Sequence, residues 1–333
     1  MRKINLGVIG VGHLGRFHIQ NYQQIAQAEI VGVYDSNQKR CQEIADEFQV
    51  TAFTQFNALL EKVEAVSIVV PTVKHFEITK ACLERGIHCL VEKPITSSLE
   101  QADQLILLAE EKRAVLQVGH IERFNPALLA LSDIHLSPMF IESHRLASFN
   151  PRGTDVAVVL DLMIHDIDII LNLIKSPVTK IDASGVAVIS TEADIANARL
   201  AFANGAVANV TASRISQKAM RKMRIFQRNA YIGIDFLQKF SEVYRLVDRD
   251  NYQIQANQFP IELGHIDGKS NPQKIVYERK QVEEVNALKM ELEAFLDSIS
   301  HGTVPAVSGK DGREALRVAI EITNIINEQI KLL

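Results

Sequence analysis

The segment LDLMIHDIDIILNL, from Leu160 to Leu173, is apolar, yet it carries carboxylate and imidazole groups of the kind that exchange protons in enzymes. At ~3.6 residues per turn, a helix would align four of its polar side chains on one face. These side chains are Asp161, His165, Asp168 and Asn172. Apolar residues cover the remaining circumference. An ordinary surface helix instead has a wide polar face and a narrower apolar one. We therefore predict that the stripe faces a cleft. The alternative is a mostly buried helix whose acids reach the surface or bond neighbouring backbone.

A glycine motif near the N-terminus could hold phosphates. In LGVIGVGHLGRFH, Gly10-x-Gly12-x-x-Gly15 directly follows an apolar strand and opens a helix. The first glycine permits a tight turn, the second lets the backbone approach a pyrophosphate, and the third lets helix and strand pack closely. His13 and Leu14 begin the helix, whose N-terminus supplies unpaired N–H groups. The alternative is a glycine-rich turn in a Rossmann-like fold that binds no nucleotide.

An acidic residue after the next strand indicates which dinucleotide binds. Asp35 lies twenty residues past Gly15. A carboxylate at this position hydrogen-bonds the adenosine ribose hydroxyls and repels a 2′-phosphate. We therefore predict NAD rather than NADP as the cofactor, although Lys39 and Arg40 follow closely and favour the opposite choice.

Short apolar runs and helical patterns alternate along the first part of the chain, and the elements that they predict must position these residues. Such alternation is typical of a parallel sheet with crossover helices. The predicted strands are Ile4–Ile9, Ile30–Tyr34, Ala65–Val70, His88–Val91 and Val115–Val118. The predicted helices are Leu14–Gln24, Gln38–Phe48, His75–Arg85 and Leu99–Arg113.

The pattern changes after Gly119. A linker helix, a strand over Met139–Ser148 and the apolar helix precede longer strands over Val178–Val247. Two helices, Val282–Ser300 and Gly312–Lys331, close the chain. We predict an α/β protein. Residues 1–122 form an NAD-binding Rossmann domain with a doubly wound parallel sheet. Residues 123–333 form an α+β domain with a mostly antiparallel open sheet, which serves substrate binding and oligomerisation. The sequence does not decide whether the C-terminal helix packs back on the first domain.

Length and composition are compatible with this division. The chain has 333 residues, 47% of them hydrophobic and 23% charged, which fits a two-domain globular protein. The net charge of −4 does not favour a nucleic-acid partner. Three cysteines without ligand spacing predict reduced thiols and no metal site. An early first strand and the lack of a long apolar run predict a cytoplasmic protein without a signal peptide or membrane insertion.

A second motif makes a family resemblance visible. VEKPITSS delivers Glu92, Lys93 and Pro94 to the carboxyl edge of the sheet, where ligands of such folds bind. With GVIGVGHLGRFH, VVPTVKH, EKP and LDLMIHDID in this order, the chain resembles the glucose–fructose oxidoreductase/inositol dehydrogenase (Gfo/Idh/MocA) family over essentially its whole length. One departure is visible: the segments DVAVVLD and LMIH stand where many members have a glycine pair and a small residue.

The resemblance implies oxidation of a secondary alcohol and assigns Lys93, Asp161 and His165 to the catalytic group. The hydride goes to nicotinamide, and the proton needs a base that titrates near neutral pH, which suits His165. The developing alkoxide needs a positive charge, which suits Lys93. Asp161 would hold a substrate hydroxyl or favour the imidazolium. Asp168 is interpreted as an anchor for His165.

Further site residues follow from the resemblance. Pro71, Thr72 and His75 are expected to touch the dinucleotide, with a structural turn as the alternative. Glu92 is expected to bond the nicotinamide ribose, and a cis peptide bond is expected between Lys93 and Pro94.

The substrate pocket is less well defined by the sequence. Arg123 and Asn125 are candidate substrate-binding residues, with a linker salt bridge as the alternative. If the substrate carries a diphosphate, arginine or lysine should lie near it, which nominates Arg152, Arg214 and Lys218. Lys218 is the first residue of the segment KAMRKMRIF, and Arg214 lies four residues before it. The alternative is that this segment forms only a solvated strand face.

Within the family, VGHIERFNPA and VVLDLMIHDIDI are most similar to enzymes that oxidise C3 of UDP-N-acetylglucosamine. By resemblance, the 3-keto product would feed an aminotransferase in lipid A biosynthesis, and the protein would be a homodimer or homotetramer. The alternatives are another sugar or polyol dehydrogenase, acting on inositol or a UDP-hexuronate, and a non-catalytic dinucleotide-binding regulator.

Overall fold

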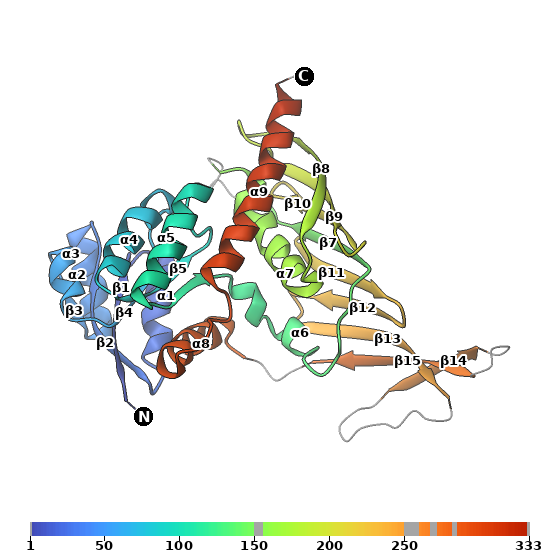
Figure 1. Cartoon of the computed structure of the whole chain (residues 1–333), viewed down its shortest axis with the longest axis horizontal. Coiled ribbons are helices and arrows are strands. Elements are labelled where there is room, and N and C mark those ends of the chain that lie inside the picture. The colour runs from blue at the N-terminus through green and yellow to red at the C-terminus, as the bar shows by residue number, and fades with distance from the viewer. Residues whose placement is uncertain (1, 150–155, 250–259, 267–271, 282–284, 332–333) are drawn as a thin grey trace. The chain divides into compact units, whose positions relative to one another are not determined.

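The chain folds into two compact units in this computed structural model, which describes residues 2–149, 156–249, 260–266, 272–281 and 285–331 (Figure 1). The first unit combines Met1–Ile121 with Asn286–Arg317, and the second combines Glu122–Val285 with Val318–Leu333. A segment near the end of the chain therefore packs with the N-terminal part, which its position in the sequence does not indicate.

The first unit contains a six-stranded sheet in the order β3-β2-β1-β4-β5-β6. Every pairing in it is parallel. The strands are β1 (Ile4–Ile9), β2 (Ala28–Tyr34), β3 (Thr51–Ala52), β4 (Ala65–Ile68), β5 (His88–Glu92) and β6 (Leu116–Gly119). β1, β4 and β6 are buried almost throughout, which explains their continuous apolar runs. The order reverses direction between β1 and β4, as in a doubly wound Rossmann fold, and confirms the predicted fold of this part.

Helices cover both faces of this sheet. Since right-handed crossovers run in opposite directions from β1 and from β4, α1 and α4 lie on opposite faces. The helix α8 packs beside α1 and buries Leu292 and Phe295 in the same core as Ile19 and Tyr22. The helices of this unit are α1 (His13–Tyr22), α2 (Gln38–Phe48), α3 (Phe56–Leu60), η1 (Thr72–Lys74), α4 (His75–Glu84), α5 (Leu99–Lys112), α8 (Ala287–His301) and the start of α9 (Gly309–Ile330).

The second unit contains a nine-stranded sheet in the order β14-β15-β13-β12-β11-β7-β10-β9-β8. Only the β7–β10 pairing is parallel among the described strands, and the others are antiparallel. The strands are β7 (Phe140–Leu146), β8 (Val178–Val186), β9 (Ile195–Phe202), β10 (Val207–Ser213), β11 (Met220–Gln227), β12 (Ala230–Asp235), β13 (Phe240–Asp248), β14 (Ile261–Ile266) and β15 (Gln273–Lys280). The predicted mostly antiparallel sheet is confirmed.

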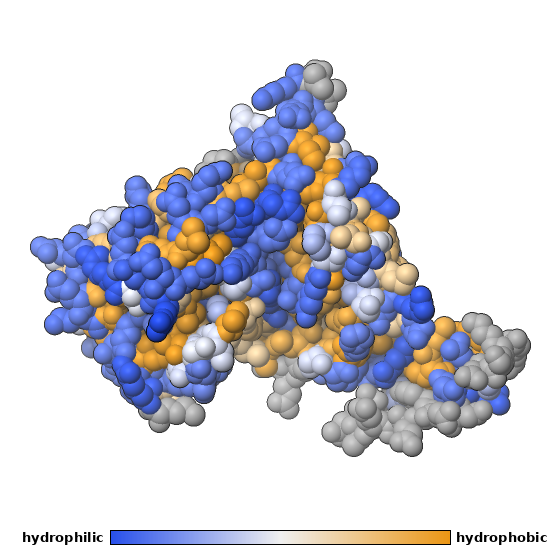
Figure 2. Space-filling view, viewed as in Figure 1, coloured by the Kyte–Doolittle hydropathy of each residue, from blue (hydrophilic) through white to orange (hydrophobic). Residues whose placement is uncertain are grey.

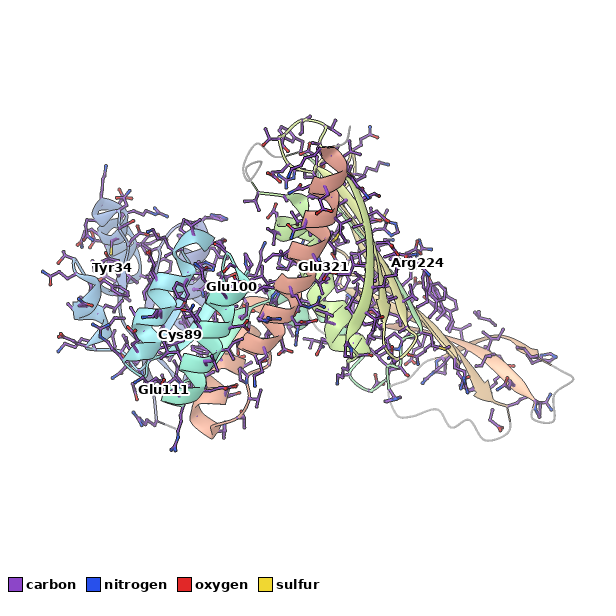
Figure 3. All side chains as sticks on the ribbon, turned by 45° about the horizontal axis from the view of Figure 1, so that its top comes forward. Tyr34, Cys89, Glu100, Glu111, Arg224 and Glu321 are labelled. Atoms are coloured by element: carbon purple, nitrogen blue, oxygen red, sulfur yellow. The ribbon has the colours of Figure 1, made fainter. Side chains whose placement is uncertain are left out.

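One face of the nine-stranded sheet is covered and the other is open. The helix α7 (Ile164–Ile174) and the C-terminal part of α9 pack against the covered face, and Arg224 points from the open face (Figure 3). Short elements connect the layers: η2 (Ile121–Phe124), α6 (Pro126–Leu129) and the π-helix η3 (Val159–Met163).

The open face carries a row of aromatic side chains across five neighbouring strands, which we call the aromatic row. Their ring centroids lie 4.9 to 5.7 Å apart. The row consists of Phe140, Phe226, Tyr231, Tyr244 and Tyr277, which face one another directly in the strand register. Charged groups such as Arg224 and Glu142 share the same face. The open face is thus amphipathic rather than uniformly apolar.

Several elements differ from the sequence-based expectations. β3 and α3 were not predicted, because two and five residues are too short to show a period. β14 and β15 were also missed. The single regular helix expected from Leu160 is wrong at its beginning, because η3 has π-helical turns there.

The surface and helices of the described residues add two observations. Figure 2 shows an apolar patch over α5, where Leu107 is 66% exposed on a mostly hydrophilic surface. None of the helices in the described part of the chain combines the length and hydropathy needed to cross a membrane.

Candidate functional site

The glycine loop between β1 and α1 has the geometry that its motif predicts. Gly10 has a φ of +88°, and a Cβ there would lie 2.2 Å from the Val69 carbonyl oxygen. A Cβ on Gly15 would lie 2.0 Å from the Gly10 carbonyl oxygen, so helix and loop meet without room for a side chain. At Gly12 a Cβ would meet no atom within 4 Å, which leaves the open approach that a pyrophosphate requires. His13 and Leu14 are exposed at the start of the ten-residue α1.

Asp35 follows β2 and ties the glycine loop to the next turn. Its Oδ2 accepts a hydrogen bond from the Val11 N–H at 2.8 Å, and its Oδ1 accepts from the Asn37 N–H at 2.8 Å. Each carboxylate oxygen can accept more than one bond, so capacity remains for ribose hydroxyls. Arg40 donates to the Val11 carbonyl oxygen at 3.3 Å and lies 3.7 Å from Glu43. The Asp35 carboxylate and the Arg40 guanidinium thus each already have partners within the first unit.

A pocket of about 420 Å³ extends from the glycine loop, and its residue types fit an adenosine. Asp35 and Pro71 line it together with side chains that the sequence did not nominate. The rings of Tyr34 and Phe56 lie 5.6 Å apart and contribute an apolar wall. The full lining is Ile9, Gly10, Gly12, Tyr34, Asp35, Ser36, Phe56, Val69, Val70, Pro71, Lys74 and Ile78. Phe56 was missed because α3 itself was missed, whereas Tyr34 could have been found as the neighbour of Asp35.

The EKP segment follows the end of β5. Lys93 is half-buried, and its peptide bond to Pro94 is cis, as expected. Glu92 lies 3.0 Å from Nε2 of the buried His18. His75 is buried with its two ring nitrogens 2.8 Å from the carbonyl oxygens of Pro94 and Val70. Contacts of Glu92, Thr72 and His75 with the dinucleotide stay predictions.

The segment that carries Asp161 and His165 changes its helical form between them. Asp161 lies in η3, and His165 lies in the first turn of α7. Since π-helical turns hold more residues than α-helical turns, Asp161 is rotated away from the ideal stripe. Both residues are half-buried among mostly buried neighbours. Single-turn π-helical segments inside helices are frequent at functional sites, so the departure favours a site here.

Asp168 is the buried partner of Arg123. The guanidinium donates to both carboxylate oxygens, at 2.7 and 2.6 Å, and reaches the Asn172 oxygen at 3.4 Å. The bidentate pair fixes the short η2 segment to α7. This geometry corresponds to the salt bridge that the sequence left as an alternative for Arg123, and substrate contact by Arg123 stays a prediction.

A second buried ion network lies under the same helix. Arg145 of β7 donates to Asp166 at 2.6 Å and to Glu122 at 2.8 Å, and all three side chains are nearly inaccessible. Burial raises the pKa of Glu122, but the charges of Arg145 and Arg221 outweigh it and hold this pKa below its usual value. This pairing gives Asp166 a structural role in the packing of α7. The partners could not be read from the sequence because they come from three separate elements.

The remaining candidates have diverse surroundings. Asn125 caps α6 by accepting from the Ala127 N–H, and its amide donates to Glu122 at 2.9 Å. Arg214 is buried, 3.9 Å from Asp194, and Lys218 is exposed beyond β10. Arg152 lies outside the described residues. No cluster of three or more potential metal-ligating side chains occurs in the described part of the chain.

Family comparisons agree with the fold and the glycine loop. Residues 4–120 match the oxidoreductase family with an NAD-binding Rossmann fold, and residues 141–232 match the Gfo/Idh/MocA C-terminal domain. The chain belongs to the Gfo/Idh/MocA family of oxidoreductases. The predicted family, enzyme class and NAD-binding domain are confirmed.

Individual relatives narrow the comparison. The chain is 39% identical over 323 residues to UDP-N-acetylglucosamine 3-dehydrogenase of Acidithiobacillus ferrooxidans, covering 97% of both chains. The solved structure of that enzyme superposes with a TM-score of 0.86 at 37% identity, covering 98% of each chain. A myo-inositol 2-dehydrogenase of Thermotoga maritima is 24% identical, with coverage of 98% of this chain and 97% of its own. A levoglucosan dehydrogenase in complex with NADH and levoglucosan shares the fold, with a TM-score of 0.81 at 18% identity and 98% coverage of each chain.

Proposed function

We propose that this protein oxidises a secondary hydroxyl of a nucleotide sugar with NAD, and that the reaction takes place at C3 of UDP-N-acetylglucosamine. The supporting observation is the 39% identity to a UDP-N-acetylglucosamine 3-dehydrogenase across 97% of both chains. The relatives that act on inositol share far less of their sequence. The open approach at Gly12 and the adenosine-sized pocket beside Asp35 fit the cofactor.

The proposed mechanism distributes the charges of an alcohol oxidation over three side chains. NAD⁺ supplies the hydride acceptor when it is bound. His165 accepts the hydroxyl proton, since an imidazole titrates close to neutral pH. Lys93 stabilises the developing alkoxide by its positive charge. Asp161 binds a neighbouring substrate hydroxyl, and Arg123 with Asp168 holds η2 against α7.

The product of this reaction is a ketone at C3 of the sugar. A ketone is the electrophile that an aminotransferase requires, so an amination step would consume it. This agrees with the lipid A pathway that the family resemblance implies. NAD and nucleotide sugars are both cytoplasmic metabolites, and we infer a cytoplasmic location from this substrate pair.

We also infer a homodimer, or a tetramer of such dimers, joined through the open face of the nine-stranded sheet. The aromatic row supports this assembly, because aromatic side chains are enriched at interfaces. The flanking ion pairs, such as Arg224 with Glu142, would fix the register between copies.

A substrate screen tests the proposed function. Purified protein is mixed with NAD and, in turn, UDP-N-acetylglucosamine, UDP-hexuronates, myo-inositol and scyllo-inositol, and NADH formation is followed by absorbance. We expect the highest kcat/KM with UDP-N-acetylglucosamine, and mass spectrometry should show loss of two hydrogens from the sugar. A preference for an inositol would replace the proposal with a polyol dehydrogenase. NAD binding without turnover of any compound would favour a dinucleotide-binding regulator.

A further inference from the structure

Lys93 is flanked by two residues that buried histidines contact from opposite faces of the Rossmann sheet. His18 comes from α1 and lies against Glu92, the residue before the lysine. His75 comes from α4 and lies against Pro94, the residue after it. Both histidines are at most 1% exposed, and neither belongs to the three-residue catalytic group.

The contact from α1 holds the Glu92 side chain in a confined space. His18 Nε2 lies 3.0 Å from Glu92 Oε1. An ionised carboxylate can only accept, so Nε2 carries the proton, and Nδ1 has no hydrogen-bond partner among the described residues. Gly119 lies opposite Glu92 in the β5–β6 register, and a Cβ there would lie 3.0 Å from both carboxylate oxygens. The glycine therefore leaves the room that the carboxylate occupies.

The contact from α4 holds the backbone on the other side of the lysine. His75 Nδ1 is 2.8 Å from the Pro94 carbonyl oxygen, and Nε2 is 2.8 Å from the Val70 carbonyl oxygen. Carbonyl oxygens only accept, so the ring donates to one of them when neutral and to both when charged. Burial lowers the pKa of His75, more than the neighbouring carbonyls and the Glu92 charge raise it. The ring links the segment after β4 to the segment after β5.

We propose that His18 and His75 are positioning residues for Lys93: together they fix the residues on its two sides, and so set where its ammonium group lies. This inference rests on the proposed function, in which Lys93 stabilises the alkoxide. A displacement of about 1 Å can reduce turnover by about 100-fold without removing any catalytic group. Losing either imidazole should therefore lower kcat although Lys93 itself remains.

Amide substitutions separate the two contacts of His75. An asparagine amide nitrogen occupies nearly the position of Nδ1, and a glutamine amide nitrogen occupies nearly that of Nε2. His75→Gln keeps the Val70 contact and loses the Pro94 contact, so kcat should fall roughly 10- to 100-fold. His75→Asn keeps the Pro94 contact, so its kcat should be at least tenfold higher than that of His75→Gln. The Kd for NADH is measured in both variants, because His75 is also expected to touch the dinucleotide, and kcat is compared at saturating NAD.

At His18 the contact with Glu92 is made by Nε2, so glutamine rather than asparagine keeps it. His18→Gln should retain more activity than His18→Asn. Gly119→Ala would place a Cβ 3.0 Å from the same carboxylate and should lower kcat as well. Tyr22→Phe is the matched control, because it removes a buried 2.8 Å hydrogen bond to Ser67 from the same helix without touching Glu92. Its kcat should stay within about threefold of the unmodified protein.

The unmodified protein is assayed first, so loss of the proposed function is recognised as absent UDP-N-acetylglucosamine turnover. A second readout does not depend on turnover: the acylation rate of Lys93 by an amine-reactive ester, relative to the exposed Lys218, measured by mass spectrometry with NADH present. The ratio should change in His75→Gln and not in Tyr22→Phe. Three results would overturn the inference. The first is a His75→Gln variant with full kcat and an unchanged acylation ratio. The others are equal kcat values for His75→Asn and His75→Gln, and a kcat for Tyr22→Phe as low as that of His75→Gln.

Discussion

At the residue scale, the proposed chemistry depends on Lys93 and His165. Lys93→Met removes the positive charge and keeps much of the side-chain volume, and His165→Asn removes the base but keeps a polar group. Turnover should fall by roughly 100-fold or more in each variant, the scale of a lost electrostatic or acid–base group. NAD affinity should stay near normal, because neither residue belongs to the glycine loop or the adenosine pocket. Calorimetric titration with NAD, beside steady-state rates, measures both quantities.

Asp161→Asn provides the comparison within the same segment. If Asp161 only positions the substrate, its loss should mainly raise KM. Full turnover by both Lys93→Met and His165→Asn would remove the catalytic role from η3 and α7, and would return that segment to a buried structural helix.

We also propose that Asp35 is the main determinant of the preference for NAD over NADP. Asp35→Ser removes the charge that repels a 2′-phosphate and leaves Lys39 and Arg40 nearby, so the preference for NAD over NADP should narrow or reverse. The structure adds a second effect. The carboxylate also accepts from the Val11 N–H, so the affinity for NAD itself should fall as the glycine loop loses this contact. Kd values for both dinucleotides in both proteins test this, and tighter NADP binding by the unmodified protein would contradict it.

The geometry of the glycine loop and the position of Asp35 after β2 could be predicted, because both depend on backbone conformation and on the adjacent strand. The positive φ of Gly10 and the absence of space at Gly15 follow from the motif itself. The pairing of Arg123 with Asp168 joins residues 45 positions apart, and only the packing of η2 on α7 brings them together.

At the element scale, Asp194 organises the loop between β8 and β9. Its carboxylate is buried and accepts from three consecutive N–H groups, those of Val188, Ile189 and Ser190, at 2.7 to 3.1 Å. Burial raises the pKa of Asp194, but these hydrogen bonds outweigh it and lower the pKa to about 2. An unfolded aspartate titrates at about 3.9, so the folded state gains from ionisation above that pH.

Asp194→Asn should therefore reduce the free energy of unfolding by on the order of 1–2 kcal/mol at neutral pH, after allowance for solvent screening. The difference between the two proteins should persist down to about pH 4 and shrink as the pH falls towards 2, because protonation removes the advantage of the carboxylate. Urea unfolding of both proteins between pH 6 and pH 2.5 measures this difference. A difference that stays constant over that range would mean that ionisation of Asp194 does not stabilise the fold.

Element boundaries were predictable where burial is continuous or a cap is visible. β1 begins and ends at the predicted residues because of its apolar run, and the largely exposed α2 does so because Asn37 caps its first turn. The π-helical turns of η3 were not predictable, because one extra residue per turn does not disturb an almost wholly apolar pattern. The placement of α8 against α1 depends on long-range packing that no local period encodes.

At the scale of the whole molecule, the proposed assembly depends on the aromatic row. Tyr244→Glu places a charge between two neighbouring rings, 5.5 and 4.9 Å away, and burying that charge in an interface would be costly. We expect the unmodified protein to have the mass of a dimer or tetramer at micromolar concentration, and the variant to have a lower mass by analytical ultracentrifugation. Leu107→Glu, on the apolar patch over α5, is the control and should not change the mass. A monomeric unmodified protein would exclude the assembly.

The composition of the aromatic row has an optical consequence. The chain has no tryptophan and six tyrosines, and three of these belong to the row while Tyr34 lines the adenosine pocket. Ultraviolet emission therefore arises from tyrosine alone, and the blue fluorescence of bound NADH can be recorded without excitation transfer from tryptophan. Association through the open face would alter the emission of the row, whereas dinucleotide binding would quench Tyr34. The unmodified protein thus carries two intrinsic fluorescent reporters, one for assembly and one for cofactor occupancy.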